Sequence, residues 1–294
     1  MMDAAEERQI ASNYMGDFAW PTVLLAVVLT AAYVTVIVAG VTRTIPLWVG
    51  LLINSWLTFC FYTLHHEANH GTISGRHKNL KWLNDGIGMI AAIPLQLGFR
   101  PYSKMHLAHH AHTNVPDRDP DFFLYVDAER VIPHGLSAAV IKTLVCIPFM
   151  PTILTTLAPK TTSGAVEYFA TRRPGVRRYS QICLLVLVLL AIAGWGVEAL
   201  MLWWIPTLLG LLMLDAWFVW LPHRPFTETS RYRNTRIKAW FGSGVILLGQ
   251  DYHLIHHLYP KVPFYRYRSL FREIRPSLEE HDAVIEGVDA TQPV

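Results

Sequence analysis

Cysteine and charged residues are both scarce in this chain of 294 residues. Its three cysteines, Cys60, Cys146 and Cys183, lie singly in apolar runs, which excludes a disulfide framework and a cysteine-ligated metal site. Charged residues make up 16% of the chain, whereas about a quarter is usual in soluble domains. With 52% hydrophobic residues and a mean hydropathy of +0.28, the composition predicts a membrane protein. Free thiols in apolar segments favour a reducing compartment for its polar parts.

Residues 1–17 lack the features of a targeting sequence. Arg8 is their one basic residue, whereas a secretory signal begins with positive charge and a transit peptide is rich in arginine. We therefore expect a short polar tail that is retained.

Four apolar runs are long enough to form membrane-spanning helices, which need about 20 residues. They cover approximately residues 18–40, 45–64, 182–200 and 203–221. Short joins at Val41–Thr44 and around Glu198–Trp204 make each pair an antiparallel hairpin. The sequence therefore predicts an all-α integral membrane fold with four transmembrane helices, in which Asn54 faces the interior of the bundle.

Two further apolar segments are interrupted by polar residues and prolines. Residues 82–99 contain Asn84, Asp85 and Pro94, and we expect an interfacial helix there. Residues 136–158 are interrupted in the same way, so the sequence leaves open whether they dip into the membrane or span it.

Lysine and arginine are unevenly distributed along the chain. Of the 25, thirteen lie at positions 76–178, ten lie from position 224 onward, and none lies at positions 182–221. Basic loops stay on the cytoplasmic side of a membrane. The predicted cytoplasmic parts are therefore both termini, two metal-binding parts at residues 65–181 and 222–275, and a soluble tail at residues 276–294.

Three short motifs contain eight of the fourteen histidines. They read His66-Glu67-Ala68-Asn69-His70, His106-Leu107-Ala108-His109-His110 and His253-Leu254-Ile255-His256-His257. Histidines three and four apart share one face of a helix, and neutral imidazole suits iron, zinc or copper. Eight ligands exceed the four that tetrahedral zinc uses, so the pattern favours two metal ions. Five others are expected to be ordinary surface residues: His65, His77, His112, His134 and His281.

Longer stretches around these motifs resemble the membrane fatty-acid desaturase and hydroxylase superfamily, and most closely its non-haem di-iron β-carotene hydroxylases. The matching stretches are His106–Asn114, Asp117–Asp121, Leu221–Phe226 and Gly249–Pro260. The resemblance implies two iron ions, O₂ as co-substrate and a lipid-soluble substrate. It also implies that His223 is a ninth ligand. Family members often carry a polar residue one turn earlier, where this chain has Val219, and Asp215 lies a further turn away.

Several carboxylates near the motifs could orient the ligand histidines through hydrogen bonds. Asp251, two residues before His253, is the leading candidate. The other carboxylate candidates are Glu67 and Asp121, followed by Asp117 and Asp119; Asn114 and Tyr252 are further, non-carboxylate candidates.

The resemblance implies an O₂-dependent oxidoreductase, and we expect hydroxylation of the β-ionone ring of β-carotene. The alternative is a fatty-acyl desaturase or hydroxylase. A more remote alternative is a zinc protease that uses His66-Glu67-x-x-His70, although this leaves the other two motifs unexplained. Metal binding or transport without catalysis is equally remote, because transporters place their ligands within the spans.

Electrons are expected to come from a separate protein, because the sequence has no cytochrome b5-like part, flavin site or dinucleotide fingerprint. The expected donor is a ferredoxin, or cytochrome b5 with its reductase; nucleic acid is not an expected partner. Five basic residues could dock an acidic donor or contact anionic lipid, and the sequence leaves both possibilities open. They are Lys261, Arg266, Arg268, Arg272 and Arg275.

Overall fold

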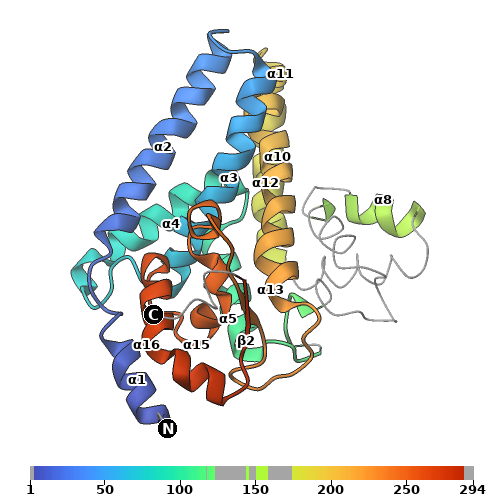
Figure 1. Ribbon diagram of the computed structural model, residues 1–294. Coiled ribbons are helices and arrows are strands. Elements are labelled where there is room, and N and C mark those ends of the chain that lie inside the picture. The colour runs from blue at the N-terminus through green and yellow to red at the C-terminus, as the bar shows by residue number, and fades with distance from the viewer. Residues whose placement is uncertain (1–2, 117, 123–143, 146–149, 158–173, 288–294) are drawn as a thin grey trace.

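The computed structural model describes residues 3–116, 118–122, 144–145, 150–157 and 174–287, and these residues are mainly helical (Figure 1). The long helices are α2 (Trp20–Val41), α3 (Leu47–His70), α4 (Lys81–Leu95), α5 (Phe99–His112), α10 (Pro174–Ile192) and α16 (Tyr267–Glu280). A continuous helical stretch from Gly196 to His223 comprises α11 (Gly196–Ala199), η2 (Leu200–Trp204), α12 (Ile205–Leu214), η3 (Asp215–Trp220) and α13 (Leu221–His223).

Shorter elements complete the described structure. They are α1 (Ala4–Ser12), η1 (Lys78–Leu80), α8 (Met150–Leu157), α14 (Ser243–Ile246), η4 (Gln250–Tyr252), α15 (His253–Leu258) and η5 (Phe264–Arg266). Strands β1 (Arg236–Lys238) and β2 (Val284–Glu286) pair in parallel, with Ile237 opposite Ile285. The predicted all-α fold is therefore confirmed except for this small two-stranded sheet.

Among the described residues, three helical stretches are long and apolar enough to cross a membrane: α2, α3 and Gly196–His223. Helices α2 and α3 overlap the first two predicted spans and form the predicted hairpin. The fourth predicted span falls within the long stretch. Helix α10 lies at the position of the third predicted span, but it is not among these three, so four membrane crossings remain a prediction.

The predicted join of the second hairpin was wrong. Glu198–Trp204 is helical, and the chain instead turns at Ala193–Trp195, so α10 ends at Ile192 and the next helix begins at Gly196. Apolar residues continue through the turn and gave no signal for it. Gly194 makes the turn with φ of 90°, a left-handed conformation that glycine adopts without steric cost. Both hairpin turns lie at one end of the bundle, where Arg43 pairs with Glu198.

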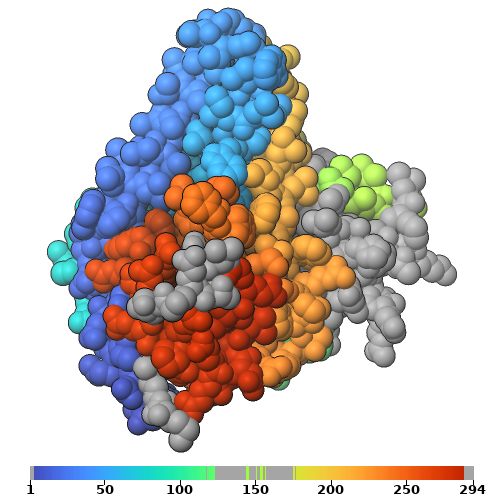
Figure 2. Space-filling view, in the orientation of Figure 1, coloured from blue at the N-terminus to red at the C-terminus, as the bar shows by residue number. Residues whose placement is uncertain are grey.

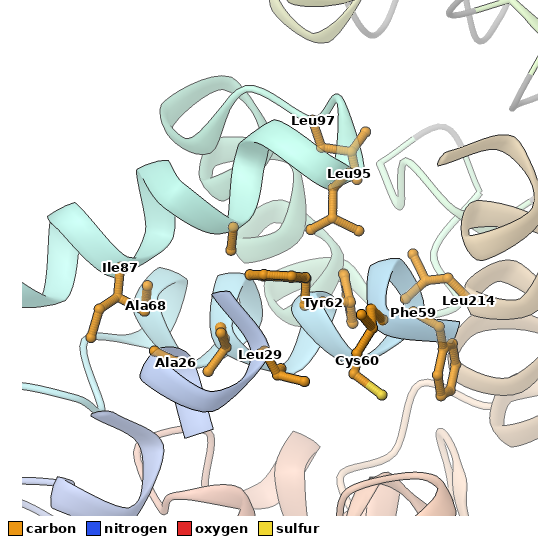
Figure 3. Packing of buried hydrophobic residues seen from close by; sticks show 14 of the residues in the cluster. Ala26, Leu29, Phe59, Cys60, Tyr62, Ala68, Ile87, Leu95, Leu97 and Leu214 are labelled. Atoms are coloured by element: carbon orange, nitrogen blue, oxygen red, sulfur yellow. The ribbon is translucent and has the colours of Figure 1, made fainter. Parts of the chain in front are cut away.

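The core of the bundle forms around α3, which packs against α2, α4 and α12 (Figure 3). Gly210 of α12 faces Thr58 of α3, and a Cβ atom at Gly210 would lie 2.7 Å from the Thr58 methyl group. The glycine therefore allows these helices to approach closely. Asn54 is fully buried and donates to the Leu202 carbonyl at 2.7 Å, which confirms that it faces the interior.

Helices α2 and α10 present apolar side chains on their outer faces. The exposed residues include Leu24, Val27 and Val34 on α2, and Ile182, Leu185 and Leu189 on α10. Such faces would be unfavourable in water but suit contact with lipid chains. Helix α4 packs on α3 while exposing Trp82 and Ile93, which agrees with the predicted interfacial helix.

A second apolar core lies beyond one end of the bundle, between α15, α16 and the sheet. We call α15, α16 and the sheet the base of the molecule. Figures 1 and 2 show the base, coloured orange to red, with the N-terminal helix α1 against it. Glu7 of α1 is 1% exposed and accepts hydrogen bonds from Tyr259 and Ser277, which fastens α1 to the base. Most of residues 136–158 lies outside the described residues, as do Asp117 and His134, so the membrane position of that segment remains open.

Candidate metal centre

All three histidine motifs reach the end of the bundle that faces the base. The first motif forms the last turn of α3, which ends where Gly71 adopts φ of 70°. The second motif lies in the last two turns of α5, and the third motif forms α15. His223 ends the helical stretch that starts at Gly196. Four separate chain segments therefore bring the nine predicted ligands together.

Five of these histidines form a first group, which consists of His66, His70, His106, His110 and His256. Their Nε2 atoms converge. The Nε2 atom of His256 lies 2.9 Å from that of His66 and 2.8 Å from that of His110. The Nε2 atom of His106 lies 2.9 Å from that of His70.

The other histidines form a second group beside the first. His109, His223 and His257 place their ligand atoms within 4.8 Å of one another. His253 adjoins them, because its Nε2 atom lies 3.0 Å from that of His223 and 3.1 Å from that of His257. The sequence predicted that the histidines of one motif share a helix face and act together. The structure instead divides the second motif between the groups: His106 and His110 belong to the first group, and His109 belongs to the second.

The arrangement fits two metal ions. Two nitrogen ligands about 2.1 Å from one ion, at right angles to each other, would lie about 3 Å apart, which is the spacing seen in both groups. Converging nitrogen atoms cannot all satisfy one another by hydrogen bonding, since a neutral imidazole has one N–H. The nitrogen-only donor set suits iron as well as zinc or copper.

Burial keeps the imidazole rings neutral, which metal binding requires. It lowers the pKa of His253 to about 3 and holds the pKa values of His106, His110, His256 and His257 well below their usual range. The neighbouring histidines add to this effect because like charges in one site disfavour protonation.

Hydrogen bonds at Nδ1 orient three of the rings. His109 Nδ1 lies 2.8 Å from Asp119 Oδ1, and Asp119 is fully buried. His256 Nδ1 lies 2.9 Å from the Tyr267 hydroxyl, and His257 Nδ1 lies 3.3 Å from the Thr113 hydroxyl. A proton held on Nδ1 leaves the Nε2 lone pair free for a metal.

The three leading orienting candidates are all buried close to the motifs. Glu67 accepts a hydrogen bond from Thr72 at 2.8 Å. Asp251 accepts from Ser243 at 2.7 Å, and the backbone N–H of Asp121 donates to Asp119 at 2.9 Å. Their action on the metal ligands remains a prediction. Asp119, which the sequence did not rank first, is in contact with a ligand histidine, His109.

Sequence reasoning missed Tyr267 and misplaced His65. Tyr267 lies eleven positions after His256 and outside every motif, so no local pattern marked it. His65 is fully buried, not a surface residue: its Nε2 donates to the Leu97 carbonyl at 3.1 Å, on the side of α3 that faces α5. A histidine beside a motif that lies on a buried helix shares that burial. His77 and His281 are exposed as predicted, and His112 is half-buried.

Aromatic rings pack against the first group from the bundle side. The hydroxyl groups of Tyr62 and Tyr102 are hydrogen-bonded at 2.9 Å, and the Tyr102 ring stacks on the His106 ring. Phe218 contacts Tyr62 edge-on, with ring centroids 5.0 Å apart. Val219 is 7% exposed, so an apolar side chain is buried one turn before His223.

Comparison with known protein families gives a match that includes all nine histidines of the site. The model of the family "Fatty acid desaturase" matches residues 42–287. The chain belongs to this family. Membership in the desaturase family, together with the apolar helices, identifies an integral membrane protein, and it supports an oxidoreductase acting on a hydrophobic substrate.

Individual relatives in the desaturase family are distant. The chain is 26% identical to a beta-carotene ketolase from Paracoccus sp. over 73% of this chain and 75% of that protein. It is 23% identical to a chloroplastic omega-6 fatty acid desaturase from Spinacia oleracea, over 90% of this chain and 60% of that protein. These relatives place the chain close to carotenoid oxygenases within the superfamily predicted from the motifs.

Proposed function

We propose that this protein is a di-iron oxygenase of the membrane that hydroxylates a ring carbon of a carotenoid, most simply the β-ionone ring of β-carotene. The division of nine imidazoles into two adjacent groups carries the proposal. The first group would hold one iron through five histidines, and the second would hold the other through His109, His223, His253 and His257. A zinc protease needs one metal, and it would leave the second group without a function.

Residues around the histidines would orient the ligand rings and exclude water from the site. The irons, when bound, would supply the O₂ activation that an unactivated C–H bond requires. Asp119 and Tyr267 would keep the Nδ1 protons of His109 and His256 in place, so that Nε2 faces the metal. Tyr62, Tyr102 and Phe218 would exclude water on the bundle side and form an apolar wall for the substrate.

The balanced reaction sets what else is needed. Hydroxylation converts a C–H bond, O₂, two electrons and two protons into an alcohol and water. A second hydroxylation of the same ring carbon would give a geminal diol, which loses water to form a ketone. Similarity to a beta-carotene ketolase therefore fits the same first step.

A second candidate is desaturation of an acyl chain. Relatives such as the sn-1 oleoyl-lipid 12-desaturase from Picosynechococcus sp., 30% identical over 34% of this chain, support it. Removal of hydrogen from two adjacent carbons would then form the double bond, and both oxygen atoms of O₂ would leave as water. The match to the chloroplastic omega-6 desaturase from Spinacia oleracea covers 90% of this chain and 60% of that protein, which also supports this candidate. We place the carotenoid substrate first because two beta-carotene ketolases match about three quarters of both chains, 72–73% of this chain and 74–75% of their own.

The orientation in the membrane is part of the proposal. Helices α5 and α15, which carry two of the histidine motifs, lie at one end of the bundle, whereas the two hairpin turns lie at the other (Figure 1). The described basic residues Arg76, Lys78 and Lys104 lie beside the first histidine group. Basic segments favour the cytoplasm. With α10 as a fourth crossing, both termini and the metal site would face the cytoplasm.

Expression in bacteria that accumulate β-carotene tests the function directly. Pigments and fatty acids are extracted together from cells that carry the wild-type chain and from cells that carry His256→Ala. We expect more polar carotenoids in the wild-type cells alone. Unchanged pigment beside new unsaturated or hydroxylated acyl chains would support the second candidate, and no oxidised product in either extract would contradict the proposal.

A further inference from the structure

A basic cavity of about 960 Å³ lies beside the first histidine group. Residues from the loop after α1, the end of α3, the start of α4 and the first half of α5 line it. Among the described residues around it, Asp85 alone is acidic, and Asp85 already pairs with Lys81 at 2.5 Å. Six exposed basic side chains line the cavity: Arg76, Lys78, Lys81, Arg100, Lys104 and Lys261. The cavity therefore carries a strong positive charge.

The cavity and the first histidine group share one residue, His70. His70 lines the cavity, and its Nε2 atom lies 2.9 Å from Nε2 of His106. Next to it, Ser103 of α5 donates a hydrogen bond to the side-chain amide oxygen of Asn69, which fixes the end of α3 against α5. Electron transfer slows steeply with distance, so a redox centre above this cavity would have a short path through His70.

We propose that this cavity is the docking site of an acidic one-electron carrier protein of the ferredoxin type. The inference rests on the proposed function, because hydroxylation consumes two electrons. Two carrier molecules in turn would each be oxidised by one electron, while O₂ and two protons are converted into the alcohol oxygen and water. Complementary charge speeds such encounters, and electron-transfer complexes need only small interfaces.

The basic surface of α16 is a weaker candidate for this docking. Arg266, which precedes α16 at the end of η5, lies 2.8 Å from Asp17, and Arg275 of α16 lies 2.7 Å from Glu279, so both already have acidic partners. The cavity instead has a predicted metal ligand in its wall. Anionic lipid headgroups also attract basic residues at a membrane surface, so they are the competing occupant.

Two matched variants of the full, iron-loaded chain separate these surfaces. Lys78→Glu with Lys104→Glu changes the cavity, and Arg268→Glu with Arg272→Glu makes the same change of charge on α16. Each protein is placed in nanodiscs of zwitterionic lipid. Binding of oxidised [2Fe–2S] ferredoxin is measured by surface plasmon resonance at several salt concentrations, and oxidation of reduced ferredoxin is followed by stopped flow. Iron content and melting temperature verify that the variants are intact.

We expect the cavity variant to bind ferredoxin at least tenfold more weakly, with less dependence on salt, and to oxidise it more slowly. The α16 variant should remain within about twofold of wild type. Equal weakening in both variants, or unchanged binding in the cavity variant, would overturn the docking site. Wild-type protein that binds no ferredoxin, but retains anionic lipid that the cavity variant loses, would identify a headgroup site and also overturn it.

The same protein distinguishes a failure of docking from a failure of the proposed function. A single turnover of β-carotene needs no carrier protein when the wild-type protein is reduced by dithionite without O₂, freed of excess dithionite and then exposed to O₂. Turnover with dithionite but without ferredoxin binding would overturn the docking site alone. Ferredoxin binding that the cavity variant loses, without carotenoid turnover, would support the docking site and overturn the substrate proposal.

Discussion

Replacement of Tyr267 by phenylalanine removes one hydroxyl group and keeps the ring that packs in the base. Tyr267 is fully buried, and its oxygen lies 2.9 Å from Nδ1 of His256. With metal at Nε2, Nδ1 carries the proton, and this N–H donates a hydrogen bond to the Tyr267 oxygen. Burial raises the pKa of Tyr267 well above its usual range, so the hydroxyl stays neutral.

Two effects follow from the loss of this hydroxyl. The buried N–H of His256 would lack an acceptor, at a cost of about 1–3 kcal/mol while metal fixes the tautomer. Loss of a partner that orients a ligand histidine weakens metal binding by about 10–100-fold. Because a neutral hydroxyl orients the ring less strongly than a carboxylate, we expect about a tenfold loss of iron affinity, or about 1.4 kcal/mol.

Competition with a chelator of known affinity measures this change in Tyr267→Phe and wild-type protein. Thermal unfolding with and without iron supplies the control: without metal, His256 can move its proton to Nε2, so the variant should lose less stability than it loses with iron. Iron affinity within twofold of wild type would refute the orienting role of Tyr267.

Three further predictions concern other described residues. Asp119→Asn removes the charge beside His109 and should lower iron affinity about tenfold or more, measured by the same competition; an unchanged affinity would contradict the contact with His109. His65→Ala should lower the melting temperature but keep the wild-type iron content, and iron loss equal to that of His256→Ala would place His65 in the site. A cysteine at Ala193 should react with an impermeant maleimide from outside intact cells, and reaction only after lysis would reverse the proposed topology.

The sequence predicted the first hairpin from a local pattern, and it predicted the meeting of the motifs from their recurring histidine spacing and from the basic residues that put them on one side of the membrane. An apolar run of span length with a short polar join allows few other structures. Histidines three and four apart on a helix share one face wherever the helix lies. The first motif directly follows the second apolar run in the sequence, so its position at the end of a membrane-spanning helix could be predicted.

The second hairpin turn could not be placed in this way. Its apolar run continues without a polar break, so hydropathy put the turn near Glu198, whereas the turn occurs at Gly194. The glycine was a signal of backbone conformation, which a count of apolar residues does not register. Glu198 lies near this turn, and its ion pair with Arg43 joins it to the turn of the first hairpin. This contact between distant parts of the chain could not be predicted from either segment alone.

The contacts that orient the ligand histidines could not be predicted from the sequence either. Asp119 was one of several equivalent acids, and only the fold brings it to His109. Tyr267 comes from α16, and His256 comes from α15; the two helices must pack before the hydroxyl reaches the ring. The division of the histidines into two groups likewise depends on how four segments pack.

Metal analysis of purified protein tests the two-iron site most directly. Iron and zinc are measured per chain in wild type, His256→Ala and His223→Ala, all extracted from membranes under the same conditions. Since each variant removes a ligand from one group only, we expect about two irons per chain in wild type and about one in each variant. A single zinc ion in wild type, or loss of all metal in either variant, would contradict two separate iron sites.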